Sequence, residues 1–357
     1  MIQSVEIENF KCFRSLELPE LSRVNLISGA NNVGKTSLLE ALFIFHDRTS
    51  PAMFLGHISR RGIDQIGIDP EMVWAPYFYN LDLKNIIGIK VERDGGAESA
   101  TYKYNPVLSP PPSHELIAQP SEKLVSTEGS IRSMAAIEIT YIDSRGGETK
   151  GTCYFRGNEP TLSFEGLPLV APKAAIVPAR DRVPSKDETA RLSKVRETKR
   201  YEMVEDFLRI IAPDVKDLQV NTSWGKPLVF CDIGLPRQIP IGYAGDGLTR
   251  LLSIILEMAE AHDGGLVLID EVENGIHYSV QEKFWKALSE AAKELDCQVI
   301  ATTHSHECLQ AACSAFDGLF EPEFRYIRLE RIGEDIKAKT FTHEMLETAL
   351  ESDLEVR

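Results

Sequence analysis

Residues 29–36 read Gly-Ala-Asn-Asn-Val-Gly-Lys-Thr and could bind the phosphates of a nucleotide. A short apolar stretch, 24–28, precedes them, and 37–43 begins an amphipathic helical pattern. Glycines let consecutive backbone N–H groups surround a phosphate, and a helix N-terminus adds partial positive charge. Lys35 would reach the outer phosphates, and the Thr36 hydroxyl would hold Mg²⁺. The segment therefore predicts a nucleoside triphosphate site that includes Asn31, Asn32, Val33, Gly34, Lys35, Thr36 and Ser37.

A second group of chemically capable residues follows two apolar stretches near the C-terminus. Residues 266–269 are all apolar and are followed by Asp270 and Glu271. Ligands gather at the carboxyl edge of a parallel sheet, so Asp270 is predicted to support Mg²⁺. Glu271 is predicted to polarise the water that attacks the γ-phosphate. The next strand pattern, 298–302, leads to His304, which we predict as a catalytic sensor of the γ-phosphate.

The elements that must position these residues alternate between helix and strand at both ends of the chain. Residues 2–10 alternate apolar and polar side chains, as in a half-buried strand, and helical patterns cover 248–261 and 279–295. This rhythm predicts an α/β fold with a mixed or parallel sheet and helical crossovers.

The middle of the chain lacks this alternation of helix and strand patterns, which predicts an inserted segment. Short β-like runs include 86–92 and the hairpin 137–141 with 151–155, and one helix is expected over 187–212. We therefore expect a discontinuous head, 1–50 and 226–357, enclosing a β-rich lobe and a helical segment over 51–225.

Composition excludes several classes of protein. The chain has 357 residues, is 43% hydrophobic and carries a net charge of −15, as expected for a soluble globular protein without an extended nucleic-acid-binding surface. The longest apolar runs are too short to cross a bilayer, which predicts no membrane partner. The six cysteines form no C-x-x-C pair, so they predict reduced thiols and a cytoplasmic location.

Together these motifs resemble the SMC/RecF-like branch of the ABC-type ATPases, specifically the bacterial AAA15/AAA_21 family related to the ATPase part of OLD nucleases. The resemblance is carried at both ends of the chain by 7–14, 29–36, 245–250, 268–277 and 301–305. It implies an ABC-type head that binds ATP and Mg²⁺ and hydrolyses ATP. The glutamine loop of such ATPases cannot be aligned, and Gln65 is the candidate for it.

The resemblance also implies a composite site between two copies. Gly245, Asp246 and Gly247 would form the ABC signature, which completes the site of the opposing subunit, with Asp246 and Arg250 acting in trans. Residues 273–277 would form the D-loop at the interface. Arg14 would lie against the base or ribose. The resemblance therefore implies that the protein forms a homodimer or a higher homo-oligomer.

Two outputs remain open. The first is a switch that controls a separately encoded nuclease- or toxin-like effector, as related ATPases do in anti-phage defence. The second is a RecF-like ATPase that binds DNA in repair or processing. Residues 180–200 hold eight basic side chains against four acidic ones and could bind DNA, or could simply form a solvated helix face. The acidic net charge and the absence of coiled-coil arms favour the first output.

Overall fold

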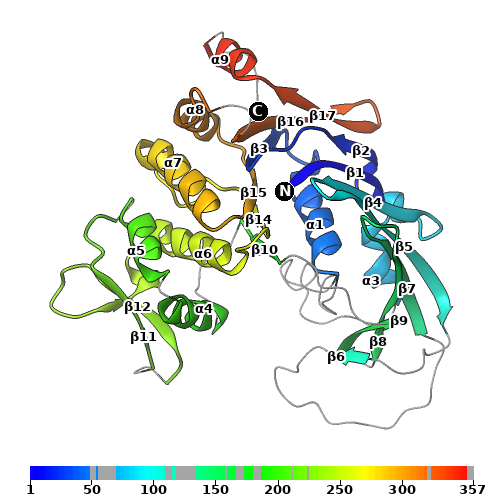
Figure 1. Ribbon diagram of the computed structural model, residues 1–357, viewed down its shortest axis with the longest axis horizontal. Coiled ribbons are helices and arrows are strands. Elements are labelled where there is room, and N and C mark those ends of the chain that lie inside the picture. Colours follow the sequence, from blue (N-terminus) through cyan, green and yellow to red (C-terminus); the bar gives the residue numbers. More distant parts are fainter. Residues whose placement is uncertain are drawn as a thin grey trace.

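The chain folds around two sheets that share a helix. The computed structural model describes residues 1–48, 54, 70–108, 115–117, 134–156, 159–165, 173–179, 186–198, 200–210, 212–222, 225–319 and 323–351. One sheet has six strands and the other has eight, and helix α1 (Lys35–His46) lies between them (Figure 1).

The six-stranded sheet carries the predicted nucleotide residues. Its order is β10 (Ala174–Val177), β14 (Leu266–Ile269), β15 (Gln298–Thr302), β3 (Val24–Gly29), β16 (Phe324–Ile332) and β17 (Asp335–Phe341). All neighbours are parallel except β16 and β17. The central strands β3, β14 and β15 are buried along their whole length, since helices cover both faces of a parallel sheet.

Alternate residues of each central strand enter different hydrophobic cores. On one face the strands pack against α1, which in turn packs on the eight-stranded sheet. On the other face they pack against α6 (Asp246–Glu260), α7 (Tyr278–Glu294) and α8 (His306–Ala315). The predicted α/β class with helical crossovers is confirmed.

The eight-stranded sheet is antiparallel and includes the N-terminus. Its order is β2 (Phe13–Leu18), β1 (Ile2–Phe10), β4 (Ile86–Arg93), β5 (Gly96–Leu108), β7 (Met134–Ile142), β8 (Glu148–Arg156), β9 (Glu159–Glu165) and β6 (Glu115–Ile117). The predicted hairpin is confirmed as β7 and β8. The short helix α3 (Pro70–Trp74) packs beside β7.

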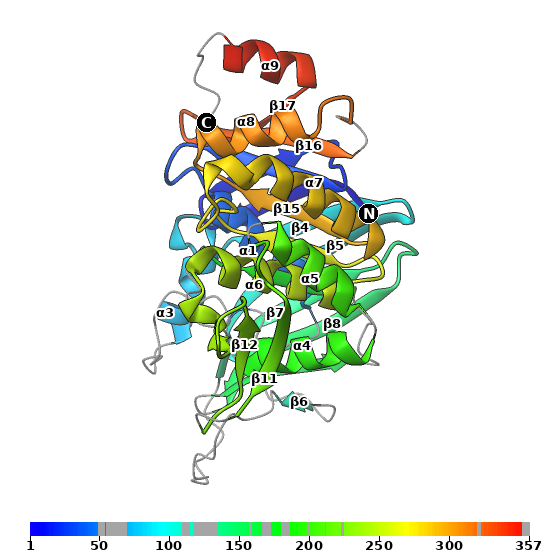
Figure 2. The ribbon, with the colours of Figure 1, turned by 90° about the vertical axis from the view of Figure 1, so that its left-hand side faces the viewer.

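The remaining elements surround these sheets. Helices α4 (Lys186–Glu197) and α5 (Tyr201–Arg209) lie beside a small sheet of β11 (Asp217–Asn221), β12 (Leu228–Asp232) and β13 (Ile239–Pro240). In Figure 2 these elements and α6 and α7 face the viewer, in front of the eight-stranded sheet. Helix α9 (His343–Glu351) packs on α8. Within the described residues no helix is long and apolar enough to cross a membrane.

The prediction of a single helix over 187–212 is wrong, because this segment forms two helices, α4 and α5, that are separated between Glu197 and Tyr201. The Thr198 hydroxyl donates to the Val195 carbonyl at 3.1 Å, and such local bonds compete with helix continuation. The Tyr201 hydroxyl accepts a hydrogen bond from the Leu218 N–H at 2.7 Å, which fixes α5 against β11.

The proposed division at residues 51 and 225 does not coincide with separate sheets. Strand β10 lies within 51–225, yet it pairs with β14 in the six-stranded sheet. Strand β4 pairs with β1, so the middle segment extends a sheet that begins at the N-terminus. The division into a head and an insertion stays a prediction, but the two are joined through both sheets.

Candidate functional site

The loop between β3 and α1 is held by glycines in conformations that other residues avoid. Gly29 has a φ of +143° and Gly34 a φ of +98°. A Cβ atom on Gly34 would lie 2.6 Å from the Cys12 Sγ and 2.7 Å from the Phe13 ring. Glycine at this position therefore lets the loop pack directly on the turn between β1 and β2.

Lys35 begins α1 and is almost completely buried inside this loop. Its Nζ donates hydrogen bonds to the carbonyl oxygens of Gly29 at 2.6 Å and Ala30 at 3.0 Å. Burial lowers the pKa of Lys35 to about 8, while the nearby carboxylates of Asp270, Glu271 and Glu273 act in the opposite direction. The predicted phosphate-binding lysine thus lies in a backbone cradle facing three acids.

Asp270 connects the two predicted nucleotide motifs. Its Oδ2 accepts a hydrogen bond from the Thr36 hydroxyl at 3.0 Å, and its Oδ1 accepts one from the Thr302 hydroxyl at 2.6 Å. A hydroxyl and a carboxylate side by side are ligands suited to a hard divalent cation that completes its shell with water and phosphate. Within the described residues no cluster of three or more His, Cys, Asp or Glu side chains could hold a metal ion. A cation held by one hydroxyl, one carboxylate, water and phosphate does not require such a cluster.

Glu271 and His304 lie together, as the predicted catalytic pair requires. The Nε2 of His304 is 3.8 Å from the Glu271 Oε1. Asn274 donates to the other carboxylate oxygen at 2.7 Å, which orients the Glu271 side chain. The Glu271 backbone has a φ of +48°, and its N–H donates to the Thr302 hydroxyl at 2.9 Å. A non-glycine residue in this strained conformation is typical of a functional site.

One residue of the site was missed by the sequence analysis, and a second was assigned only to the D-loop. Thr302, fully buried at the end of β15, accepts from Glu271 and donates to Asp270. Glu273 accepts a hydrogen bond from the His304 N–H at 2.8 Å, and within the described structure its buried Oε2 has no partner. The polar end of an apolar strand could have indicated Thr302, whereas the assignment of Glu273 to the D-loop did not predict its contact with His304.

The predicted signature and D-loop contact each other within one chain. Gly245, with a φ of +118°, precedes the first turn of α6. A Cβ atom on Gly275 would lie 3.3 Å from backbone atoms of Asp246 and Gly247. Among the described residues, Asp246 makes no hydrogen bond or ion pair with the phosphate loop. Its role in a second copy's site stays a prediction.

The expectation that Arg250 acts in trans is wrong. Its side chain is buried, and its guanidinium donates to the Asp270 carbonyl at 2.6 Å and to the Pro178 carbonyl. These partners belong to the same chain. Arg250 lies on the inward face of α6 and forms hydrogen bonds to the residues that follow β10 and β14. It is therefore not available to contact another subunit.

Among the described residues, Arg14 makes no hydrogen bond or ion pair with the phosphate loop. Arg14 forms an ion pair with Asp335 at 2.7 Å. A different cation contacts the loop: Arg331 donates to the Asn32 carbonyl at 3.2 Å. Arg331 follows Arg14 by more than 300 residues, and only the pairing of β16 with β3 brings it there. The ribose or base role of Arg14 stays a prediction.

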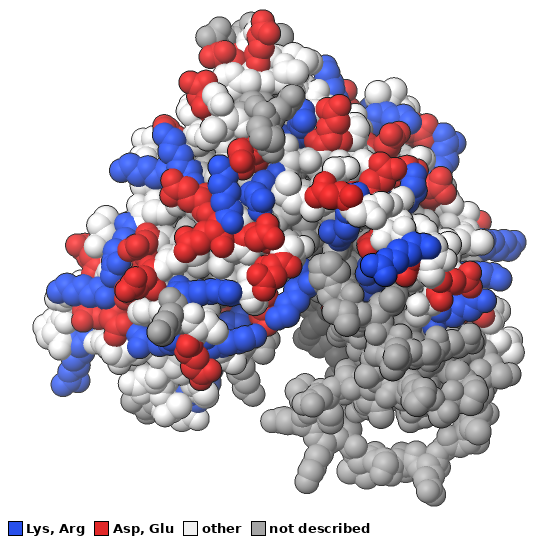
Figure 3. Space-filling view, in the orientation of Figure 1, with Lys and Arg blue, Asp and Glu red and all other residues white. Residues whose placement is uncertain are grey.

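The basic run 180–200 is partly neutralised. Arg191 pairs with Glu257 and Glu260, and Arg196 pairs with Asp217. Acidic and basic side chains also alternate over the described part of the face in Figure 3. Arg180, Arg182 and Lys199, like Gln65, lie outside the described residues. The part of the run that can be followed therefore resembles an ion-paired helix face.

Comparisons with known proteins identify relatives of this chain. The family model AAA_21, described as "AAA domain, putative AbiEii toxin, Type IV TA system", matches residues 24–309. An ATP/GTP phosphatase of Helicobacter pylori is 25% identical over 335 residues, covering 87% of both chains. An OLD nuclease of Thermus scotoductus is 23% identical over 331 residues, covering 85% of this chain and 59% of the nuclease. An SMC head crystallised with the C-winged helix domain of ScpA is 13% identical, with a TM-score of 0.49 over 96% of this chain and 98% of that one.

Proposed function

The chain belongs to the AAA_21 family and is an ATPase of SMC/RecF/OLD-like type, and from this premise we propose that it is a molecular switch driven by ATP. Two copies close head-to-head around ATP and open again after hydrolysis. The closed and open forms control a separately encoded effector, in anti-phage defence.

The observation that supports this proposal most directly is the continuous hydrogen-bonded path across the site. It runs from Thr36 to Asp270 and Thr302, and from Thr302 to the backbone of Glu271. His304 lies at the end of this path, beside the Glu271 carboxylate. A change at the γ-phosphate would therefore act on several strand ends at once.

The residues fit a hydrolytic reaction. Lys35 would neutralise the outer phosphates, and Thr36 with Asp270 would hold the divalent cation, which we propose is Mg²⁺. When bound, that ion supplies charge stabilisation at the phosphates. The Glu271 carboxylate would accept the proton of the attacking water, with Asn274 holding one oxygen and leaving the other free for the water. His304 would donate a hydrogen bond to the γ-phosphate.

Exposed aromatic side chains beside the predicted signature and D-loop support dimerisation. Tyr243 and Tyr278 flank these loops and are 75% and 68% exposed. Asp246 and Gly275 are exposed beside them. Tyrosine is enriched at the surfaces that another protein covers.

A separate effector is supported by the family description and by the charge of the chain. The description reads "putative AbiEii toxin, Type IV TA system", and we therefore propose that the chain acts together with a second component. The second candidate, a RecF-like DNA-binding ATPase, would need a basic surface. The net charge of −15 and the ion pairs of Arg191 and Arg196 favour the effector switch over it.

The test uses Glu271→Gln, which keeps the shape of the side chain but cannot accept a proton. We expect ATP binding to persist and turnover to fall by about 10²–10⁴-fold. Light scattering after size-exclusion chromatography should give a dimer in ATP and a smaller species without it. A variant that turns over ATP at the wild-type rate, or that stays monomeric in saturating ATP, would contradict the proposal.

The same variant separates the two outputs. Purified from its native host in ATP, Glu271→Gln should retain one stoichiometric protein partner if the chain is an effector switch. DNA that co-purifies and resists about 0.3 M salt, without a protein partner, would favour the RecF-like alternative, because phosphate contacts weaken steeply with salt.

A further inference from the structure

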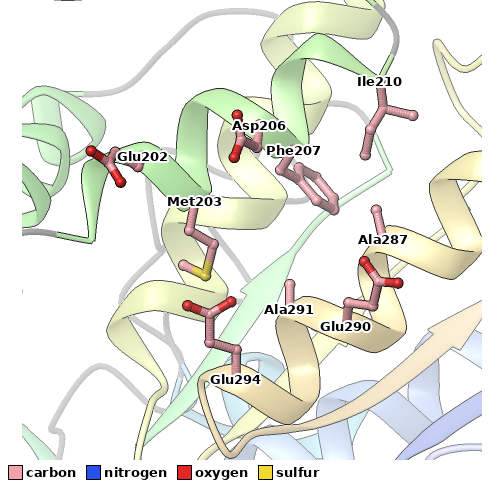
Figure 4. Close-up of a pocket in the computed structure, with 9 residues that line it drawn as sticks. All are labelled: Glu202, Met203, Asp206, Phe207, Ile210, Ala287, Glu290, Ala291 and Glu294. Atoms are coloured by element: carbon pink, nitrogen blue, oxygen red, sulfur yellow. The ribbon is translucent and has the colours of Figure 1, made fainter.

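A groove lies between α5 and α7, away from the nucleotide residues. Its cavity measures about 410 Å³. Met203 and Phe207 of α5 and Ile210 at its C-terminal end line one side of it, and Ala287 and Ala291 of α7 line the other. Figure 4 shows Met203 and Phe207 pointing toward α7 and the two alanines pointing toward α5. Because alanines are small, the side of the groove formed by α7 leaves room for another protein's side chains.

Acidic side chains border this apolar floor on both helices. Glu202 and Asp206 come from α5, and Glu290 and Glu294 come from α7. All four are exposed. Asp206 pairs with Arg209 at 2.8 Å, whereas Glu202, Glu290 and Glu294 have no cationic partner among the residues that the structure describes. An apolar groove between two rows of carboxylates fits an amphipathic helix whose apolar stripe is flanked by lysines or arginines.

We propose that this groove is the docking site for a basic amphipathic helix of the effector protein. The inference rests on the proposed switch, because it assigns a surface to its separate partner. Charge complementarity identifies the occupant: the three carboxylates without a cationic partner repel nucleic acid and attract a cationic protein segment. Leucine- or methionine-sized anchors at helical spacing would contact Met203 and Phe207 and cover Ala287 and Ala291.

The position of the groove connects docking to the nucleotide site. Helix α7 begins at Tyr278, three residues after Gly275 of the predicted D-loop. Phe207 of α5 contacts Phe284 of α7, with ring centroids 6.0 Å apart. Helix α5 also packs on α6, which begins at the predicted signature. A docked helix would therefore touch α7, which begins next to the predicted D-loop, and α5, which packs on the helix that begins at the predicted signature.

Fluorescence anisotropy with a synthetic peptide tests the groove directly. The probe is a labelled peptide of about 15 residues, with leucines at helical spacing and lysines on both flanks. We expect it to bind the wild-type chain, and to bind the double variant Glu290→Lys/Glu294→Lys about tenfold more weakly or worse. Ala287→Phe, which fills the groove without changing charge, should also weaken binding. ATPase activity should stay at the wild-type level in both variants, which shows that they are folded.

Two controls separate a built site from general attraction to an acidic protein. Glu334→Lys changes an exposed acid in the turn between β16 and β17, and should leave peptide affinity unchanged. A peptide of the same composition but without an apolar face should not bind. Equal binding of both peptides, or equal loss in Glu334→Lys, would overturn the inference. Failure of the peptide to bind while Glu271→Gln still dimerises in ATP would remove the docking site and leave the switch intact.

Discussion

Lys35 determines how nucleotide binding should depend on pH. Its pKa is lowered to about 8 by burial, so it loses its proton as pH rises through about 8, well below the range of a free lysine. Because only the ammonium form attracts phosphate, we expect ATP affinity to fall steeply between about pH 7 and pH 9. Titration calorimetry should also detect proton uptake on binding near pH 8, since bound phosphates raise the pKa again.

Two substitutions check this assignment. Lys35→Ala should abolish ATP binding at every pH. Lys35→Arg should bind more weakly than wild type but without the pH dependence, because a guanidinium keeps its proton throughout this range. An affinity of the wild-type chain that stays constant up to about pH 9 would show that another cation holds the phosphates.

At this scale the sequence predicted residues that carry their own local pattern. Lys35 and Thr36 lie in a glycine-rich loop, and Asp270 follows an apolar strand. The residues next to each of them in the sequence therefore indicate its role. The local pattern marks Thr302 only as the polar end of an apolar strand, and it does not mark Arg331 at all. Their contacts depend on the order of β14, β15, β3 and β16 in the sheet, which local patterns leave undetermined.

Among the elements, the C-terminal end of α1 is fixed to the eight-stranded sheet by buried charges. The guanidinium groups of Arg48 and Arg93 lie 3.8 Å and 3.6 Å from the Glu98 carboxylate. Arg48 also stacks on the Tyr141 ring at 3.9 Å. Burial and the Arg93 charge lower the pKa of His46 to about 3, so His46 is neutral and Glu98 is the anion that both arginines face.

Glu98→Gln should therefore destabilise the chain. Removal of the carboxylate charge leaves the buried Arg48 and the partly buried Arg93 without a compensating carboxylate, and we expect the free energy of unfolding to fall by about 2 kcal/mol. Urea denaturation followed by circular dichroism measures this change. Glu92→Gln on the neighbouring strand is the matched control, because Glu92 pairs with an exposed lysine and should contribute little. Equal stability of the two variants would show that the charges at the end of α1 are solvated.

The contact between the D-loop and the start of α6 provides a second test at the level of elements. Gly275→Ala places a methyl group 3.3 Å from the Asp246 and Gly247 backbone, at a φ of +77°. Gly264→Ala meets nothing within 4 Å at a similar φ of +84°, so it carries only the cost of the left-handed backbone, about 1 kcal/mol. We expect Gly275→Ala to lose more stability than this control and to lose ATP-dependent dimerisation in light scattering. Identical behaviour of the two variants would exclude a role for the contact.

Elements were predicted best where their pattern is long and regular. Strand β1 and helices α6 and α7 lie within two residues of the expected ranges. The break between α4 and α5 was not expected, because the apolar spacing of Tyr201, Val204 and Phe207 indicates a helix and no glycine or proline separates it from the residues of α4. Side-chain bonds of Thr198 and Tyr201 to other backbone groups decide that break, and such bonds have no periodicity.

For the whole molecule, the architecture explains why a β-rich middle segment can influence the nucleotide site. Helix α1 starts at Lys35 and packs between the two sheets. Strand β10, from the middle segment, ends beside β14, and Arg250 ties the ends of both strands together. A displacement of either sheet would therefore reach Lys35 and Asp270, which are predicted to face the phosphates. The sequence predicted that a middle segment exists, but its sharing of both sheets depends on long-range strand pairing.

Mixed dimers test whether two whole molecules build each site. Lys35→Ala and Asp246→Arg should each be inactive alone. A mixed dimer of the two would contain one site with both lesions and one site with neither. After full exchange, half of the dimers are mixed, so we expect about a quarter of wild-type turnover. A mixture of Lys35→Ala with Glu271→Gln is the control, because both lesions then lie on the same side of each site and no intact site can form. If exchange is demonstrated by light scattering of differently sized fusions and the first mixture gains nothing over this control, Asp246 acts within its own chain.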